Sequence, residues 1–186
     1  MACALTKGRI EPCKDSVGGL KEIYFGDFGD LNATGANLTA DDSVDNFDTS
    51  AETVFKYELK GNSSFEQAIT SSRENGTTYF EQTLNLTLKK LSAADNKEVK
   101  LLAYGRPQII VRDYNDNYFL VGREHGSEVT GGTIVTGAAM ADLSGYTLTF
   151  SGQETLPANF INVDSNDGSS MVVGTTTLTI TSGSDF

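Results

Sequence analysis

The sequence has no tryptophan, and only two cysteines, three prolines and one histidine occur in its 186 residues. Two cysteines are too few for a disulfide-built scaffold. We therefore expect Cys3 and Cys13 to be free thiols, with a local disulfide or a metal pair as the alternatives. No Cys-x-x-Cys motif or neighbouring histidine supports a zinc site there.

The sequence also lacks an apolar run near the roughly 20 residues that a membrane-spanning helix needs. Residues 1–15 lack the apolar core of a signal peptide, so we expect a protein made in the cytoplasm, without a membrane partner. Basic residues are scarce, because 14 lysines and arginines stand against 25 acidic residues, for a net charge of −11. This charge disfavours a surface that binds nucleic acid by neutralising phosphates.

Alternation of apolar and polar residues is the main pattern that the sequence does contain. In residues 80–88 and 145–154, large apolar residues alternate with hydroxyl or amide residues. A period of two predicts strands with one packed face and one face in water. The polar side of these two strands carries Thr83, Asn85, Thr87, Thr147 and Thr149.

We predict a single domain over residues 1–186 that begins with an N-terminal arm of about residues 1–19. One helix is expected at residues 93–104, with Ser92 as its N-cap and Gly105 at its end. The fold class is mainly β, an orthogonal β-sandwich or open barrel with one flanking helix. Strands are expected at residues 20–25, 53–59, 63–69, 77–89, 108–112, 118–121, 128–135, 146–152 and 171–181.

Turn residues predict how some of these strands connect. Gly61-Asn62 predicts a hairpin between residues 53–59 and 63–69, with Phe55, Tyr57 and Leu59 pointing inward. Asn75-Gly76 predicts the turn that precedes the strand at residues 77–89, the longest in the protein.

A turn rich in aspartate and asparagine follows the strand at residues 108–112. Asp113, Asn115, Asn117 and Glu124 occupy positions 1, 3, 5 and 12 of an EF-hand calcium loop, but Tyr118 stands where that loop needs glycine. Because the flanking residues are typical of strands, we favour a β-hairpin turn over a calcium site.

His125 is the single histidine, and a catalytic role would require a nucleophile and an orienting acid. Ser127 and Glu128 are its neighbours in sequence, on a predicted turn, and sequence adjacency rarely gives triad geometry. No phosphate-binding glycine loop is present, and Gly131-Gly132 indicates a bulge or a close backbone approach. We expect a protein that is not an enzyme and assign no cofactor and no metal.

Residues 26–50 are rich in Gly, Asn, Asp and Thr, which predicts a long loop that buries little apolar surface. We expect this loop to contact a neighbouring subunit, so that its deletion would leave a folded monomer unable to polymerise. A hard cation bound by its aspartates is an alternative. The candidate inter-subunit residues are Asp41, Asp42, Asp45 and Asp48 in the loop, and Arg106, Arg112 and Arg123 as their basic partners.

The segment Gly145-Tyr146-Thr147-Leu148-Thr149-Phe150-Ser151-Gly152-Gln153-Glu154, with Pro157-Ala158 after it, resembles a closing strand of phage tail tube proteins. The opening residues 1–9, and Cys13-Lys14-Asp15 before Gly18-Gly19, resemble the start of small phage structural proteins. The resemblance covers the arm and about residues 77–161. It implies an orthogonal β-sandwich with a flanking helix, six copies per ring, and one sheet of each copy joining a continuous barrel around a lumen.

On this resemblance, stacked hexameric rings form a conduit for DNA ejection in the phage tail of the virion. The polar side of the two alternating strands faces the lumen, and six copies at −11 give −66 per ring, a field that discourages DNA adhesion. The expected partners are further copies, a terminator, and a baseplate or tip, with or without a sheath. The alternatives are a head decoration or connector protein, and a carbohydrate-binding β-sandwich, which the absence of tryptophan disfavours.

Overall fold

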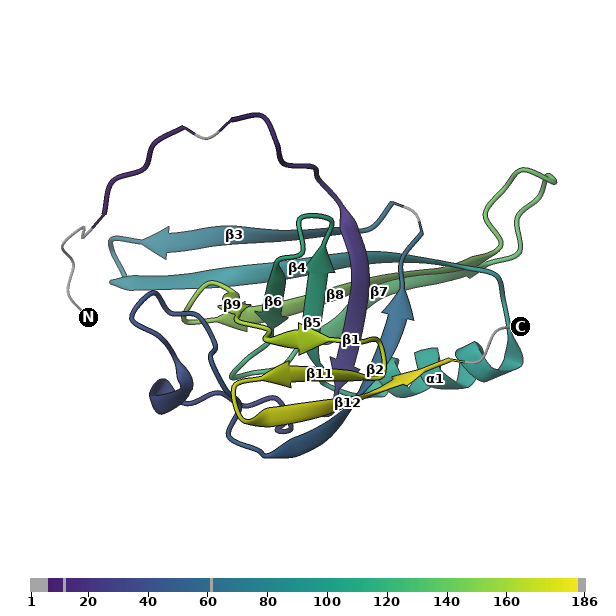
Figure 1. Cartoon of the computed structure of the whole chain (residues 1–186). Helices are drawn as coiled ribbons and strands as arrows, with labels where there is room; N and C mark the ends of the chain where they lie inside the picture. Colours follow the sequence, from purple (N-terminus) through teal and green to yellow (C-terminus); the bar gives the residue numbers. More distant parts are fainter. Residues whose placement is uncertain (1–6, 12, 61, 184–186) are drawn as a thin grey trace.

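The computed structural model describes residues 7–11, 13–60 and 62–183, and its strands form two sheets (Figure 1). The larger sheet has the order β10-β11-β12-β2-β1-β5-β6-β9, and the smaller has the order β3-β4-β8-β7. The larger sheet contains β1 (Leu20–Gly26), β2 (Ala51–Glu58), β5 (Gln108–Asp113), β6 (Tyr118–Val121), β9 (Asn159–Ile161), β10 (Ser165–Asn166), β11 (Ser170–Val173) and β12 (Thr176–Ser182). The smaller contains β3 (Ser64–Ser72), β4 (Thr77–Lys89), β7 (Glu128–Val135) and β8 (Gly145–Glu154).

The two sheets pack face to face with their strands crossing. In Figure 1 the four strands of the smaller sheet run across the view, whereas β1, β5 and β6 cross them. The larger sheet also curls, so that β11 and β12 turn away from the direction of β1. The predicted fold class, a mainly β orthogonal sandwich or open barrel with one helix, is confirmed.

Helix α1 (Ala93–Tyr104) has the predicted bounds. Its N-terminus is capped because Ser92 Oγ accepts a hydrogen bond from the Asp95 amide at 3.0 Å. At its C-terminus the Gly105 amide donates to the Leu101 carbonyl. Val99 is the buried residue of the helix, whereas Leu101 and Tyr104 are exposed. The helix therefore covers an edge of the core and presents apolar side chains outward.

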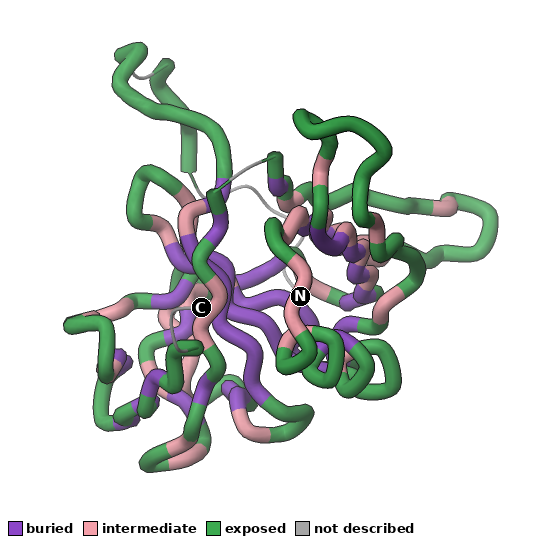
Figure 2. Tube along the Cα trace, turned by 90° about the vertical axis from the view of Figure 1, so that its right-hand side faces the viewer, coloured by how far each residue is buried: buried purple, intermediate pink, exposed green. Residues whose placement is uncertain are grey.

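Both faces of the larger sheet are buried, each in a different hydrophobic core. Ile23 and Phe25 of β1 point toward the smaller sheet, whereas Tyr24 points into the curl. Figure 2 shows the buried chain segments gathered in the middle of the molecule. The core between the sheets includes Ile109, Val111, Leu84, Leu86, Leu148 and Phe150, and the core inside the curl includes Val54, Ile110, Leu120, Met171 and Leu178.

The segment 26–50 closes the curl of the larger sheet and is part of its core. Leu31, Val44 and Phe47 are fully buried there, and Val44 bridges both Leu38 and Ile161. A short 3₁₀ turn, η1 (Gly35–Asn37), is its one helical element. The prediction that this loop buries little apolar surface is wrong, because Leu31, Val44 and Phe47 turn inward although they are irregularly spaced. Its deletion would expose the core.

A buried glutamine fastens this segment to the sheet. Gln108 of β5 is fully buried, and its Oε1 accepts from the amides of Gly29 and Leu31 at 3.2 and 2.9 Å. Its Nε2 donates to Asn32 Oδ1 and to the Arg123 carbonyl. One side chain thus satisfies polar groups from two loops that would otherwise be buried without partners.

The predicted hairpin between residues 53–59 and 63–69 is wrong. β2 lies between β1 and β12 in the larger sheet, so both of its edges are already paired, and β3 pairs with β4 in the smaller sheet. Of the residues expected inward, Leu59 is buried and Tyr57 packs edge-on against Phe25 at 5.1 Å, but Phe55 is half exposed.

The strand predicted at residues 171–181 is two strands, β11 and β12, which pair with each other. The break is at Gly174, whose φ of 59° turns the chain. A Cβ atom at this position would lie 2.4 Å from the Asp45 carbonyl oxygen, so glycine is required for both conformation and space.

Candidate assembly surface

The outer face of the smaller sheet brings together all five polar residues that alternation singled out. Thr83, Asn85 and Thr87 on β4 lie opposite Ser151, Thr149 and Thr147 on β8. Residues directly opposite each other in an antiparallel pair share one face, and all six are half-buried. Because the Leu84, Leu86, Leu148 and Phe150 side chains occupy the other face, we call this polar side the hydroxyl face.

Side chains of the hydroxyl face hydrogen-bond to one another across the strands. Thr149 Oγ1 donates to Asn85 Oδ1 at 2.9 Å, and the hydroxyls of Thr133 and Thr147 lie 2.7 Å apart. Thr87 Oγ1 donates to the Asn62 carbonyl at 3.0 Å. The face is therefore polar and uncharged along most of its length. Several of its hydroxyl and amide groups already hydrogen-bond to groups of the same chain.

Charges on the hydroxyl face are few and mostly acidic. Glu66 lies opposite Thr83, and Glu81 lies opposite Ala68, so both carboxylates share this face. Glu128 lies opposite Ser151 near the same end. Lys89 closes the other end of β4. A surface with this charge repels polyanions and offers them few contacts.

Both outer strands of the smaller sheet are long, and among the described residues each has one edge without a strand partner, with α1 packed beside β7. β3 and β7 are the terminal strands of that sheet, with nine and eight residues. Soluble proteins usually protect such edges with lysine, proline, a very short strand or a covering element. Neither strand contains lysine or proline, and each has a single charged residue.

Each of these strands also has one large apolar side chain that is exposed. Ile69 of β3 is 70% exposed and Ile134 of β7 is 57% exposed.

The predicted bulge and close backbone approach at Gly131-Gly132 of β7 are both confirmed. The register shifts between Val129 and Gly131, which marks a bulge, and a Cβ at Gly132 would lie 2.4 Å from the Thr147 carbonyl oxygen.

The four aspartates proposed for inter-subunit contacts are all exposed, on the segment that closes the curl. Asp48 Oδ1 accepts from the Thr34 amide and hydroxyl and from Asn37 Nδ2. Asp45 accepts from Asn162 Nδ2 at 2.7 Å. Asp42 adopts a left-handed φ of 58°, in a tight turn beside Asp41. Within one copy, at least two of these carboxylates thus organise their own loop.

The three arginines proposed as basic partners have contacts within their own chain. Arg123 pairs with Glu124. Arg106 donates to the His125 carbonyl, lies 3.6 Å from Glu128, and stacks over Phe28 at 4.9 Å. None of these contacts involves the four aspartates, so pairing between Arg and Asp of different copies stays a prediction.

Arg112 belongs to a buried charge network centred on Glu22. The Glu22 carboxylate accepts from Arg112 Nη1 at 2.8 Å and from the Tyr24 hydroxyl at 2.8 Å, and it lies 2.9 Å from Lys56 Nζ. Burial alone would raise the pKa of Glu22, but hydrogen bonds from Lys56, Arg112 and Tyr24 outweigh it and hold the pKa at about 2. Arg112 also reaches Asp116 at 2.6 Å. The network fixes β1 against β2 and β5.

A second polar cluster, around Glu154, was not expected from the sequence. Glu154 is buried, and its Oε1 accepts from the amides of Glu124 and His125, while its Oε2 lies 3.1 Å from His125 Nδ1. Each of these three residues offers one ligand atom, and the three atoms lie within 4.8 Å of one another, so the set could hold a metal ion.

The Ser127 hydroxyl is buried and has no hydrogen-bond partner, so Ser127 does not pair with His125.

The remaining sequence candidates have structural roles. Asp113 Oδ1 accepts from the amides of Asn115 and Asn117 at 2.8 Å each, which confirms a hairpin turn between β5 and β6. Cys13 is an exposed free thiol, and Cys3 lies outside the described residues.

Comparison of the chain with protein-family models, with curated proteins and with solved structures finds no match. None of the helices in the described part of the chain is both long enough and apolar enough to traverse a bilayer.

Proposed function

We propose that copies of this chain assemble into stacked rings that form the tube of a phage tail, a conduit through which DNA passes. The observation that carries the proposal is the pair of long strand edges on the smaller sheet that have no strand partner among the described residues. β3 and β7 have no lysine or proline, and their apolar residues Ile69 and Ile134 are exposed. Such edges are the usual sites of strand pairing between chains.

The strand directions favour closure of a ring. The smaller sheet is antiparallel throughout, so β3 and β8 run one way and β4 and β7 run the other. When β7 of one copy pairs with β3 of the next, the new pair is also antiparallel. Repetition of this contact builds a continuous barrel without free edges, and a heterologous contact of this kind closes when the rotation between copies fits.

The hydroxyl face supports the assignment of the inner wall. Its neutral Thr and Asn side chains can be wetted, and Glu66 and Glu81 give it a negative charge. Six copies with four strands each form a barrel of 24 strands, with a diameter of about 45–50 Å from strands about 4.8 Å apart tilted by about 35–45°. After side chains are added, this bore still admits a DNA duplex, and the described residues of the wall include more acidic than basic side chains, which disfavours binding of phosphate.

Negative-stain electron microscopy of the purified chain at rising concentration tests the proposal. We expect hollow tubes, or rings with six-fold symmetry. Ile69→Lys and Ile134→Lys each place a charge at an edge that pairing would bury, so each variant should remain monomeric. Thr179→Lys is the matched control, since Thr179 is exposed on β12, away from both edges.

The outcomes separate the candidate functions. Wild-type protein that stays monodisperse at every concentration would contradict the tube, as would tubes that form equally well from both edge variants. Single rings that never stack would instead favour a connector of the virion.

A further inference from the structure

A shallow apolar groove lies between α1 and the end of β1. It has a volume of about 260 Å³, and Phe28, Phe55 and Leu101 line it. Phe28 is 50% and Leu101 54% exposed, so large apolar side chains face water here. Asp27 and Glu98 add two carboxylates to the lining, and Arg106, which stacks over Phe28, adds one guanidinium. We call this site the helix groove; it has an apolar floor and one more acidic than basic group in its lining.

The N-terminal arm is the opposite kind of surface. Its described residues, 7–11 and 13–18, are all exposed, and Figure 1 shows the arm extending away from the two sheets. Ile10 is 91% exposed. Lys7, Arg9 and Lys14 give this stretch more basic than acidic residues, within a chain of net charge −11. The arm therefore carries an exposed apolar side chain, Ile10, between Arg9 and Glu11, in a stretch with one more basic than acidic residue.

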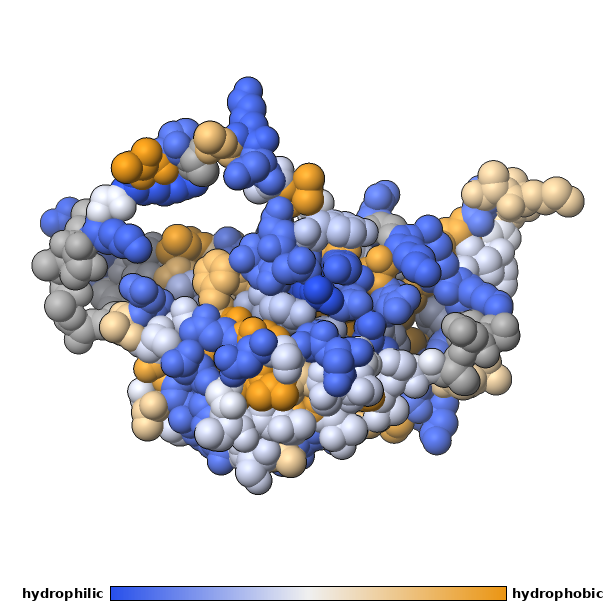
Figure 3. Space-filling model, viewed as in Figure 1, coloured by the Kyte–Doolittle hydropathy of each residue, from blue (hydrophilic) through white to orange (hydrophobic). Residues whose placement is uncertain are grey.

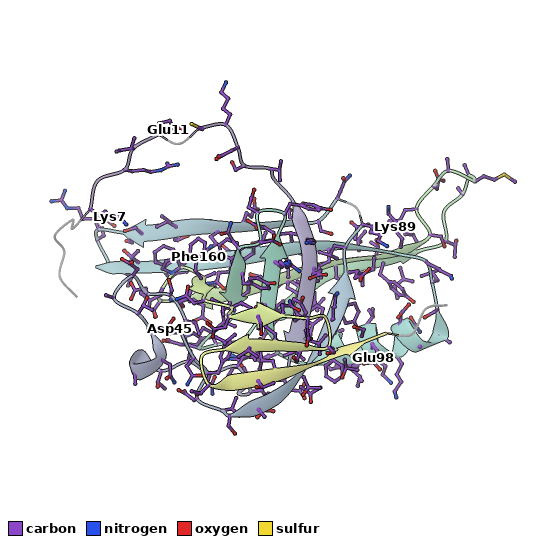
Figure 4. The ribbon with its side chains drawn as sticks, in the orientation of Figure 1. Lys7, Glu11, Asp45, Lys89, Glu98 and Phe160 are labelled. Carbon is purple, nitrogen blue, oxygen red and sulfur yellow. The ribbon has the colours of Figure 1, made fainter. Side chains whose placement is uncertain are left out.

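Among the described residues, the inner end of the arm is hydrogen-bonded to the turn between β5 and β6, where the Tyr114 amide donates to the Gly19 carbonyl at 3.3 Å. The Val17 amide donates to Asn115 Oδ1 at 2.9 Å, and Asn115 Nδ2 donates to the Val17 carbonyl at 2.7 Å. Figure 4 shows Lys7 and Glu11 far out along the arm, and Figure 3 shows the arm arching clear of the surface. Residues 7–16 can span up to about 33–36 Å. The arm thus leaves the body in a set direction and has the length to reach another molecule.

We infer that the arm of one copy docks into the helix groove of a second copy. Ile10 enters between Phe28, Phe55 and Leu101, where it buries apolar surface on both partners. Lys7 and Arg9 then lie beside the carboxylates of Glu98 and Asp27. The arm has one more basic than acidic residue and the groove lining has one more acidic than basic, and these opposite signs favour this pairing over contact between two arms or two grooves.

The positions of arm and groove make this a head-to-tail contact. The arm leaves the body at Leu20, the first residue of β1, whereas Gly26, the last, lines the groove. These ends are about 20 Å apart along the strand. A copy that receives an arm in its groove still has its own arm free, so the contact can propagate without limit. The inference rests on the proposed self-assembly and assigns the arm to the contact between stacked rings.

Cross-linking between single-cysteine variants of the full chain tests the inference. In a background with Cys3→Ser and Cys13→Ser, one copy carries Ile10→Cys and a second copy, with a mass tag, carries Leu101→Cys. After mild oxidation we expect a disulfide-linked heterodimer on a non-reducing gel. The control replaces Leu101→Cys by Met140→Cys, at a fully exposed position on the loop between β7 and β8, and should give at least tenfold less product.

Charge exchange provides a second readout on the same cross-link. Arg9→Glu should lower its yield, and Glu98→Arg on the partner copy should restore it. Equal yields with Leu101→Cys and Met140→Cys, or no heterodimer at all, would overturn the inference. Tubes that form without this cross-link would also overturn it while the tube proposal stands. Cross-linked chains that never form tubes would retain the arm contact and contradict the tube.

Discussion

Replacement of Glu22 by glutamine tests how much the buried charge network stabilises the fold. Glutamine keeps the shape of the side chain but removes the charge that lies 2.9 Å from Lys56 Nζ and 2.8 Å from Arg112 Nη1. The pKa of Glu22 falls from an ordinary value of 4.5 to about 2. At about 1.4 kcal/mol for each unit of pKa, the ionised carboxylate contributes about 3 kcal/mol to the free energy of unfolding.

The pH dependence of this contribution has a definite sign. Because the folded protein holds the pKa of Glu22 below its unfolded value, the stabilisation is fully present above about pH 4.5. It is lost as the pH falls through about 2, where the carboxyl group takes up a proton in the folded protein as well. The difference in stability between wild type and Glu22→Gln should therefore be about 3 kcal/mol at pH 7 and shrink toward zero near pH 2.

Urea denaturation of both proteins across this pH range, followed by circular dichroism, measures the difference. Glu58→Gln is the control, because Glu58 lies opposite Glu22 on β2 and contacts the same Lys56, but its side chain is 60% exposed. Exposed ion pairs contribute about 0–1 kcal/mol. The reasoning fails if Glu22→Gln costs no more than Glu58→Gln at pH 7, or if its cost does not change with pH.

Two further predictions concern the segment that closes the curl. Gln108→Leu leaves at least the buried Leu31 amide and the Arg123 carbonyl without partners, at about 1–3 kcal/mol each. The free energy of unfolding should therefore fall by about 2–6 kcal/mol, and hydrogen exchange of the Leu31 amide should accelerate. Unchanged exchange at Leu31 would contradict this. Phe47→Ala should cost about 3–5 kcal/mol in thermal or urea unfolding, because Phe47 is fully buried. Phe160→Ala is its half-exposed control, and equal costs for the two would mean that the segment is not part of the core.

Strong local patterns account for what the sequence could predict of the fold. The alternation in β4 and β8 was sufficient to place both strands and to assign Thr83, Asn85, Thr87, Thr147 and Thr149 to one side. The bounds of α1 followed from Ser92 and Gly105, which act through local hydrogen bonds. A pattern within one segment, however, does not say which strand pairs with which, so the partners of β2 were predicted wrongly.

Features that depend on distant residues were beyond sequence reasoning. Asn85 and Thr149 hydrogen-bond across 64 positions, and Glu154 meets His125 across 29. The core role of residues 26–50 was missed for a related reason. Leu31, Val44 and Phe47 have no common period, and their burial follows from the curl of the larger sheet that they cover. The open edges of β3 and β7 likewise exist only once the order of the smaller sheet is known.

The two contacts proposed for assembly use separate parts of the molecule, and this separation has a consequence for growth. Pairing of β7 with β3 uses residues of those two strands, whereas the arm precedes β1 and the helix groove is lined by residues of β1, β2, α1 and the adjoining loops. A copy that joins the first ring gains strand pairing alone, but a copy that adds to an existing ring gains strand pairing and an arm contact together. On these two proposals, addition to a ring is more favourable than formation of a new one, so we expect long tubes rather than many separate rings.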